Sequence, residues 1–462
     1  MSDAYSSLST PAGHRSSGTE SRRSVEAPLT LTDKPPRTLG AGAQTAMWAS
    51  FGVTLFGPLT GALVTQSVGS LGGGLAACAL GTLVGALLLG GAAGIGAHTG
   101  TPSMVGLRGL LGRGASVVPT VLNIAQNIGW AMMEIIVITS AATHIVGAAW
   151  HWPFVIVAGA LCTLMAIRPL GSVKILRTVM LWLVLAGSIY LFVMVLRQPS
   201  HAIGQDAVIG FWPGVDLAAA QVVSFAPLAA DYSRHATSGR SAFASSAAGY
   251  GLAIFAYYAL GVFAVAHLGG DLAGTNLLAA LMVLPVGGLA IGLLLLDELD
   301  NAFANVYSST VSVHNLAPRL DRRVISVAVG VVATVLAGLA GFDQYEGFLY
   351  LIGSAFVPLF TVAVVDFFVT RRGRWDTTAT APFRWSPTLA WFFGFVAYQL
   401  IYPGSIPGWS DLWAGLAQAL GFVAPGWLGS TLGSIVVSAV AAAGLGAIDT
   451  AVHRRRAEGR LA

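Results

Sequence analysis

The sequence predicts an all-α polytopic membrane protein with twelve transmembrane helices, and three observations support this fold class. Of its 462 residues, 55% are hydrophobic and only 10% are charged, whereas a soluble domain usually carries about 25% charged residues. The apolar residues gather into stretches near the ~20 residues that a bilayer requires. The basic residues fall almost entirely into alternate connecting segments. The chain is therefore expected to cross a membrane many times.

Twelve apolar stretches follow one another with short connections. They are residues 44–66, 70–96, 116–147, 152–167, 173–196, 215–231, 245–267, 285–313, 323–340, 346–370, 387–402 and 428–450. The 57 glycines of the chain suit close helix–helix packing in lipid, because small residues let backbones approach. The segment 272–284 is apolar but short and is followed by Pro285, so we expect an external or re-entrant helix there.

The distribution of Lys and Arg tests this topology independently. With both termini in the cytoplasm, every Lys and Arg except Arg197 falls in an inside segment. The positive-inside rule predicts this skew, so we expect a multi-pass protein of the plasma membrane with both termini cytoplasmic. The net charge of +4 then reflects orientation in the lipid bilayer. No nucleic-acid partner is expected, because no soluble face gathers the basic residues.

Three segments make up the expected domain organisation. Residues 1–40 are rich in Ser, Thr and Pro without an apolar stretch, and they are expected to form a disordered cytoplasmic tail, not a signal peptide. Residues 41–452 are expected to form a single transmembrane domain, and 453–462 a basic cytoplasmic tail. The short loops leave little surface for external partners, but a homo-oligomer within the membrane stays open.

Two helix breaks are the most informative feature of the sequence. Gly57-Pro58 interrupts the first apolar span, and Pro227 interrupts the sixth. A broken membrane helix frees backbone carbonyls and amides, which lipid tolerates only where these groups line a protein cavity. Breaks at corresponding places in two halves point to the binding site of a secondary transporter.

The third span carries a polar face in the membrane. Asn123, Asn127, Trp130 and Glu134 are spaced i, i+4, i+7 and i+11, which places them along one side of a helix. Asn123 alone suits an interhelical hydrogen bond. Trp130 and Glu134 together offer a flat stacking surface one turn from a hydrogen-bonding group, which suits a planar heteroaromatic ligand.

The eighth span carries three acids with no Lys or Arg nearby. One helix face holds Asp297, Asn301, Asn305 and Ser308, and Asp300 borders it. Buried acids need a counter-charge, which a bound cation or a retained proton would supply. We expect Asp300 and Asn301 to contact a cation or the substrate. Asp297 and Glu298 are expected to be solvated in a water-filled vestibule.

The sixth span adds an aromatic and a charged pair around its break. Phe225 lies two residues before Pro227 and is placed to stack on a ligand from the side opposite Trp130. Asp231 and Arg234 fall at the cytoplasmic end of the span, where they suit an intracellular gate or a structural salt bridge.

The sequence contains no catalytic motif. It lacks a His-Glu-x-x-His zinc motif, a phosphate-binding Gly-x-x-x-x-Gly-Lys and a Gly-x-Ser-x-Gly elbow. We therefore expect neither an enzyme nor a nucleotide-driven pump, no organic cofactor, and no metal beyond a coupling sodium ion. An intramembrane enzyme with Glu134 and Asp300 as paired acids is the remote alternative.

Four motifs resemble the nucleobase–cation symporter family 1, the purine–cytosine permeases. They are Trp48 with Pro58-Leu59-Thr60-Gly61, Asn127-Ile128-Gly129-Trp130, Pro227-Leu228-Ala229-Ala230-Asp231-Tyr232-Ser233-Arg234, and Asn305-Val306-Tyr307-Ser308. The resemblance covers roughly residues 40–450, and Ala230-Asp231-Tyr232-Ser233-Arg234 is its most specific part. The Gly-Trp pair of the third span is most similar to the hydroxymethylpyrimidine branch.

This resemblance implies a LeuT-type fold of two inverted five-helix repeats plus two extra helices. It implies that the base stacks between Trp130 and Phe225 and that Asn305 and Glu134 bind its edge. Gly57 at the first break and Asn301 complete the expected substrate set.

The resemblance also implies a cation between the first and eighth spans. The first-span carbonyls include that of Phe56, and Asp300 and Asn301 stand where the family carries hydroxyls. The coupling ion is therefore sodium or a proton. The expected mechanism is symport by alternating access, with an amino-acid or other small-solute symporter on the same fold as the rival.

Overall fold

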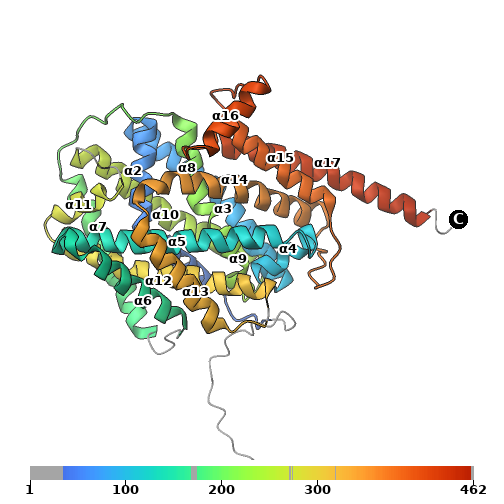
Figure 1. The fold of residues 1–462 in the computed structure, drawn as a ribbon, viewed down its shortest axis with the longest axis horizontal. Helices are drawn as coiled ribbons and strands as arrows, with labels where there is room; N and C mark the ends of the chain where they lie inside the picture. The colour runs from blue at the N-terminus through green and yellow to red at the C-terminus, as the bar shows by residue number, and fades with distance from the viewer. Residues whose placement is uncertain (1–34, 168–173, 270–271, 273, 318, 459–462) are drawn as a thin grey trace, which may run out of the picture.

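Helices make up the architecture of the protein. The computed structural model describes residues 35–167, 174–269, 272, 274–317 and 319–458. No strand forms in this part of the chain, where a single bridge joins Leu39 to Ala236. The α-helices (Figure 1) are α1 Ala41–Gly52, α2 Phe56–Val68, α3 Leu71–Thr99, α4 Ser103–Leu111, α5 Val117–Val146, α6 His151–Ile167, α7 Lys174–Leu196, α8 Phe211–Val223, α9 Ala226–Ser233, α10 Gly239–Leu268, α11 Asn276–Val283, α12 Gly287–Leu316, α13 Arg322–Leu339, α14 Tyr345–Val364, α15 Trp385–Ile401, α16 Trp409–Ala419 and α17 Ser430–Glu458.

Each predicted span overlaps a helix or a pair of helices. Among the described residues, eight helices are long and apolar enough to cross a membrane, and the bent pair α1–α2 would add a ninth. α15 has only 17 residues, and α12 carries three acids in its middle. The all-helical membrane fold is therefore confirmed, whereas the number of twelve spans stays a prediction.

The first span is broken, but not at the predicted proline. α1 and α2 meet at an angle of 60° across residues 53–55, and Pro58 lies inside the first turn of α2. The sixth span has a short interruption at Ser224 and Phe225, but α8 and α9 still run together as one candidate span, Phe211–Ser233, and Pro227 lies in the first turn of α9. Proline lacks an N–H and has a helical φ, so it suits the first turn of a helix. The prolines therefore mark where each helix resumes.

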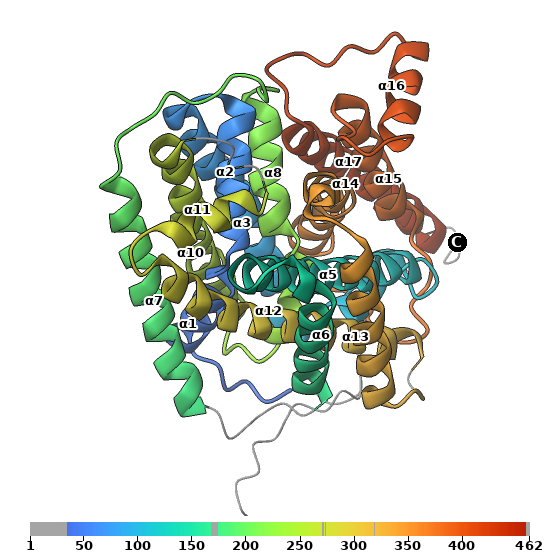
Figure 2. The ribbon, with the colours of Figure 1, turned by 60° about the vertical axis from the view of Figure 1, so that its left-hand side comes forward.

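The helices around the breaks form two groups. In the first group, α1 and α2 pack on α10, while α3 packs on α8, α9 and α10. In the second group, α5, α6, α12 and α13 pack on one another. Figure 2 shows α12, α6 and α13 together below α5, with α1, α2, α3, α8 and α10 beside them. Both breaks belong to the first group, and α5 and α12 of the second group carry most of the predicted polar residues.

Glycines bring α2 and α10 into backbone contact. A Cβ atom on Gly61 would lie 2.1 Å from the carbonyl oxygen of Tyr258, and one on Gly261 would lie 1.9 Å from that of Pro58. Only glycine permits this approach, as in other closely packed membrane helices. The glycine content predicted such packing, and these contacts hold α2 against α10 next to the first break.

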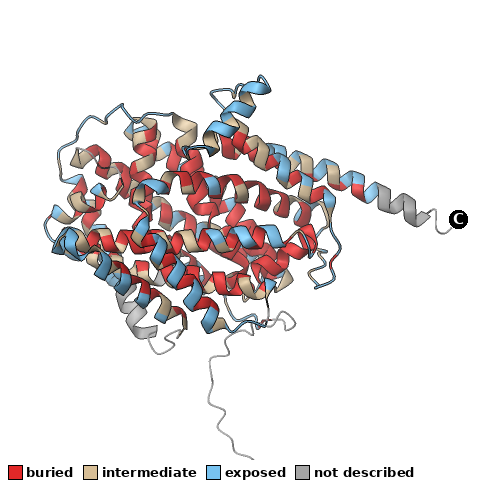
Figure 3. Ribbon diagram, in the orientation of Figure 1, coloured by how far each residue is buried: buried red, intermediate tan, exposed pale blue. Residues whose placement is uncertain are grey.

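The outer surface of the helical body is apolar, as lipid contact requires. Val324, Val331 and Leu339 of α13 are exposed, and Figure 3 shows exposed positions on the outer helices and on α16 around a buried centre. The segment 272–284 contains the short helix α11. The predicted tails 1–40 and 453–462 lie mostly outside the described residues or side chains, so their roles stay predictions.

Candidate functional site

One pocket lies where the two helix breaks meet α5 and α12. It contains about 270 Å³ of space between atoms, part of it open to the surroundings, and is lined by Phe51, Thr54, Phe56, Trp130, Glu134, Gln221, Phe225, Asn301 and Asn305. Six of the predicted site residues are therefore brought together from four parts of the sequence: Phe56, Trp130, Glu134, Phe225, Asn301 and Asn305.

Aromatic rings form the apolar walls of this pocket. Trp130 is 5% exposed and packs edge-on against Phe56, with ring centroids 5.3 Å apart. Phe225 is supported by Tyr250, with centroids 4.8 Å apart. Because each ring is held by its own neighbour, Trp130 and Phe225 contribute separate apolar surfaces to the same cavity.

Polar side chains from three helices complete the lining. The Asn305 amide on α12 donates to Glu134 Oε1 on α5, with a distance of 3.1 Å. Gln221 comes from the last turn of α8 and is 2% exposed. The predicted pair Glu134 and Asn305 thus meets directly. Gln221 was not predicted from the sequence, although its position four residues before Phe225 is a spacing that could have indicated it.

Gly57 does not line the pocket. A Cβ atom at this position would lie 2.4 Å from the Cβ of Tyr257 on α10. The missing side chain therefore serves helix packing, as at Gly61, and no contact of Gly57 with the pocket is observed. Its role in substrate binding stays a prediction that the geometry does not favour.

Glu298 reaches the first break, contrary to the expectation that it is solvated. Its side chain is fully buried, and its Oε1 accepts hydrogen bonds from the Thr54 hydroxyl at 2.8 Å and from the Leu55 N–H. The free N–H groups at the start of a helix favour a carboxylate. Glu298 therefore caps α2 from the second helix group and ties the two groups together.

The predicted cation residues lie beside this contact. The Asn301 amide is 3.5 Å from the carbonyl oxygen of Val53 at the break and 3.5 Å from Glu298 Oε2. The side chain of Asp300 lies outside the described residues. In the described part of the chain, no group of three His, Cys, Asp or Glu is placed to hold a metal ion. The cation roles of Asp300, Asn301 and Phe56 stay predictions.

A side chain of α5 donates a hydrogen bond to the backbone carbonyl freed at the second break. The Gln126 amide donates to the freed carbonyl of Ser224 and to Asn123 Oδ1, both at 3.0 Å. Asn123 in turn donates to Ser312 on α12 at 2.8 Å. The interhelical role expected for Asn123 is confirmed, and the sequence did not reveal that Gln126 holds the broken helix.

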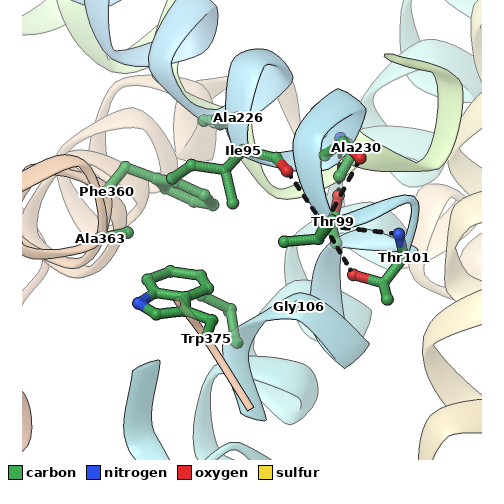
Figure 4. Close-up of a pocket in the computed structure, with 13 residues that line it drawn as sticks. Ile95, Thr99, Thr101, Gly106, Ala226, Ala230, Phe360, Ala363 and Trp375 are labelled. Atoms are coloured by element: carbon green, nitrogen blue, oxygen red, sulfur yellow. Dashed lines mark hydrogen bonds between the residues drawn. The ribbon is translucent and has the colours of Figure 1, made fainter. Parts of the chain in front are cut away.

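A second cavity lies between α3, α4, α9 and α14. It encloses about 300 Å³, and Figure 4 shows Trp375 and Phe360 among its lining side chains. The Thr99 hydroxyl there is already bonded to the Ile95 carbonyl and to Thr101, each at 3.0 Å. This cavity offers no set of convergent polar groups, so the pocket at the breaks is the better candidate for a binding site.

Comparison with known proteins now decides the family. A family model described as a permease for cytosine/purines, uracil, thiamine and allantoin matches residues 43–398, which is more than half of the chain. The chain belongs to this permease family. It is also 23% identical over 323 residues to the putative purine-cytosine permease YxlA of Bacillus subtilis (strain 168), covering 66% of this chain and 70% of that protein.

Solved structures show the fold that the permease shares. Mhp1, a nucleobase-cation-symport-1 family transporter solved with bromovinylhydantoin bound, gives a TM-score of 0.68 at 16% identity over 91% of this chain and 97% of that one. The Eremococcus coleocola manganese transporter gives 0.53 at 15% identity over 93% of this chain and 100% of that one. The resemblance to nucleobase–cation symporters is confirmed, and the permease is a transporter, not an enzyme.

The predicted gating residues of the permease lie at the end of α9. Asp231 is buried, accepts from the Ser103 N–H at 2.8 Å and accepts from the Ser308 hydroxyl at 2.9 Å. It therefore joins α9 to α4 and α12. Arg234 is also buried, but these two described side chains form no salt bridge, so the structural salt bridge, one of the two roles considered for them, is not found. Their role as a gate stays a prediction.

Replacing Asp231 by Ala is expected to weaken the contact of α9 with α4 and α12. The Ser103 N–H and the Ser308 hydroxyl would lose their acceptor inside the protein, at a cost of about 1–3 kcal/mol for each buried group. Thermal melting of the detergent-solubilised permease should show a clear loss of stability. The exposed Asp206 provides the control, since Asp206→Ala should leave the melting temperature nearly unchanged. Equal melting of the two variants would show that the Asp231 contacts do not hold the junction.

Proposed function

We propose that the permease takes up a pyrimidine- or purine-type base, favouring hydroxymethylpyrimidine or cytosine, together with a cation by alternating access. The observation that carries this proposal is the pocket at the two helix breaks, where aromatic walls and the Glu134–Asn305 pair converge. Membership of the cytosine/purine permease family supports the same substrate class.

The lining of the pocket favours a small flat ring. Trp130 and Phe225 offer ring faces on which a heteroaromatic base can stack. An aliphatic amino acid would not use these faces, so the lining supports a base over the amino-acid rival.

The polar lining favours a substrate with N–H donors. An ionised carboxylate only accepts hydrogen bonds, and Glu134 already accepts one from Asn305. An exocyclic amino group, as on cytosine or hydroxymethylpyrimidine, would supply a further donor. The Asn305 carbonyl oxygen is available to the same edge of the ring.

The position of the pocket supports alternating access. Thr54, Gln221 and Phe225 belong to the first helix group, whereas Glu134 and Asn305 belong to the second. Relative movement of two helix groups around a mid-membrane site opens such a site first to one side and then to the other. Uptake would run from outside to the cytoplasm, with both termini inside and a sodium ion or proton as the coupling cation.

Transport of radiolabelled hydroxymethylpyrimidine into proteoliposomes tests this function. We expect accumulation under an imposed inward sodium or proton gradient, and we expect excess unlabelled cytosine to compete with it. The gradient that drives uptake identifies the coupling ion. Protein-free liposomes provide the background. Uptake driven by neither gradient, with competition by amino acids and by no base, would contradict the proposal and favour the amino-acid rival.

A further inference from the structure

Gln221 is a buried polar side chain at the edge of the pocket that no family motif includes. It lies four residues before Phe225, in the last turn of α8, and lines the cavity. Its exposed fraction is 2%. A carboxamide in this position carries a donor and an acceptor side by side, in a part of the protein where water is scarce.

The side-chain oxygen of Gln221 makes no hydrogen bond within the described part of the protein. Leaving a buried acceptor without a donor destabilises a protein, so such a group is usually paired. Asn127 also carries a buried amide without a partner among these residues, but it does not line the pocket. The Trp130 indole N–H also lines the pocket without a hydrogen-bond partner among these residues, but it can only donate. Gln221 brings an acceptor without a hydrogen bond to the same cavity.

Two other polar side chains of the pocket donate to carboxylates. The Thr54 hydroxyl donates to Glu298, and the Asn305 amide donates to Glu134. Thr54 and Gln221 are the polar lining residues that come from the first helix group. Because Thr54 is engaged with Glu298, Gln221 is the group through which the first helix group can hydrogen-bond a ligand.

We propose that Gln221 binds the substrate through an edge that carries an adjacent hydrogen-bond donor and acceptor, and so links the two helix groups around it. This inference rests on the proposed transport of a base. The carboxamide oxygen would accept from an amino or ring N–H group, while its NH₂ donates to the neighbouring ring nitrogen or carbonyl. Carboxamides pair with heteroaromatic bases in this two-point way elsewhere.

Substrate contacts to both helix groups would couple binding to the approach of these groups around the pocket. A ring held by Gln221 on one side and by Glu134 on the other would contact both helix groups at once. A ligand stabilises the conformation in which it makes more contacts. Substrate binding would therefore favour the closed arrangement, and a ring without the donor–acceptor edge would bind without closing the carrier fully.

Binding of two ligands to two variants tests this assignment. Cytosine carries the exocyclic amino group, and 2-hydroxypyrimidine lacks it. For the wild type, removal of this group should weaken binding to the purified permease about tenfold, the loss typical of one or two hydrogen bonds. Gln221→Leu should bind cytosine about tenfold more weakly, and it should discriminate less between the two ligands than the wild type, keeping only the part that Glu134 contributes. If the effects of Gln221→Leu and of removing the amino group are not additive, the Gln221 side chain and the amino group interact directly.

Gln44→Leu is the matched control, because Gln44 is a buried glutamine of α1 in the same helix group that does not line the pocket. This variant should retain wild-type discrimination between the ligands. If Gln221→Leu does not elute as a monodisperse protein, Gln221→Glu replaces it, since this change keeps the shape and removes the donor. If Gln221→Leu loses affinity equally for both ligands, or loses none, the assignment of Gln221 is overturned and the proposed function still stands. Failure of the wild type to bind any base would instead overturn the proposed function.

Discussion

Replacing Trp130 by Ala should weaken base binding by about 10- to 100-fold, because stacking on an aromatic side chain contributes roughly 1–3 kcal/mol per base. Trp130 is buried at the pocket wall and is held edge-on by Phe56. Alanine would remove both the stacking surface and the support of the neighbouring ring. Uptake at low substrate concentration should fall in proportion to affinity.

Equilibrium binding of cytosine and initial uptake rates measure this effect. Trp130→Phe keeps a flat ring and should retain much of the affinity. Trp182→Ala removes a tryptophan that is 65% exposed on the outer surface and should leave binding unchanged. If Trp130→Ala binds cytosine as tightly as the wild type, the pocket at the breaks is not the base site.

The sequence predicted four residues of the pocket, some from helical spacing and others from the family resemblance. Trp130 and Glu134 stand one turn apart, and Asn305 lies on the polar face of its span. Helical periodicity fixes which residues share a face. The structure then shows Trp130, Glu134, Phe225 and Asn305 around one cavity, which periodicity alone could not show, since it does not tell which faces of distant helices meet.

The residues that the sequence missed depend on contacts between distant parts of the chain. Glu298 and Thr54 are 244 residues apart, so no local sequence pattern indicated that Glu298 is buried against the first break. The helix breaks were placed a few residues late, since proline marks the first turn of the resumed helix and not the end of the preceding one. Gln221 lies outside the motifs of the family resemblance, and its only signal is its spacing of four residues from Phe225.

Glu298 should be the most sensitive position outside the stacking residues. Glu298→Ala would leave the Leu55 N–H and the Thr54 hydroxyl without an acceptor inside the protein. Each such loss costs about 1–3 kcal/mol, and both fall at the contact between the two helix groups. We expect this variant to melt at a lower temperature and to lose transport, because the first break is no longer held against α12.

Comparison with Glu298→Gln separates the hydrogen bonds of this residue from its charge. Glutamine keeps one carbonyl oxygen, which can still accept from Leu55 and Thr54, so we expect Glu298→Gln to melt close to the wild type. Glu346→Ala, at a half-buried position in the first turn of α14, is the control for loss of a glutamate elsewhere. Recovery of transport in Glu298→Gln would mean that the cap on α2 is what transport needs. Wild-type melting without transport would show that the negative charge itself is required at the break, and equal melting of Glu298→Gln and Glu298→Ala would show that capping by the side chain does not stabilise the protein.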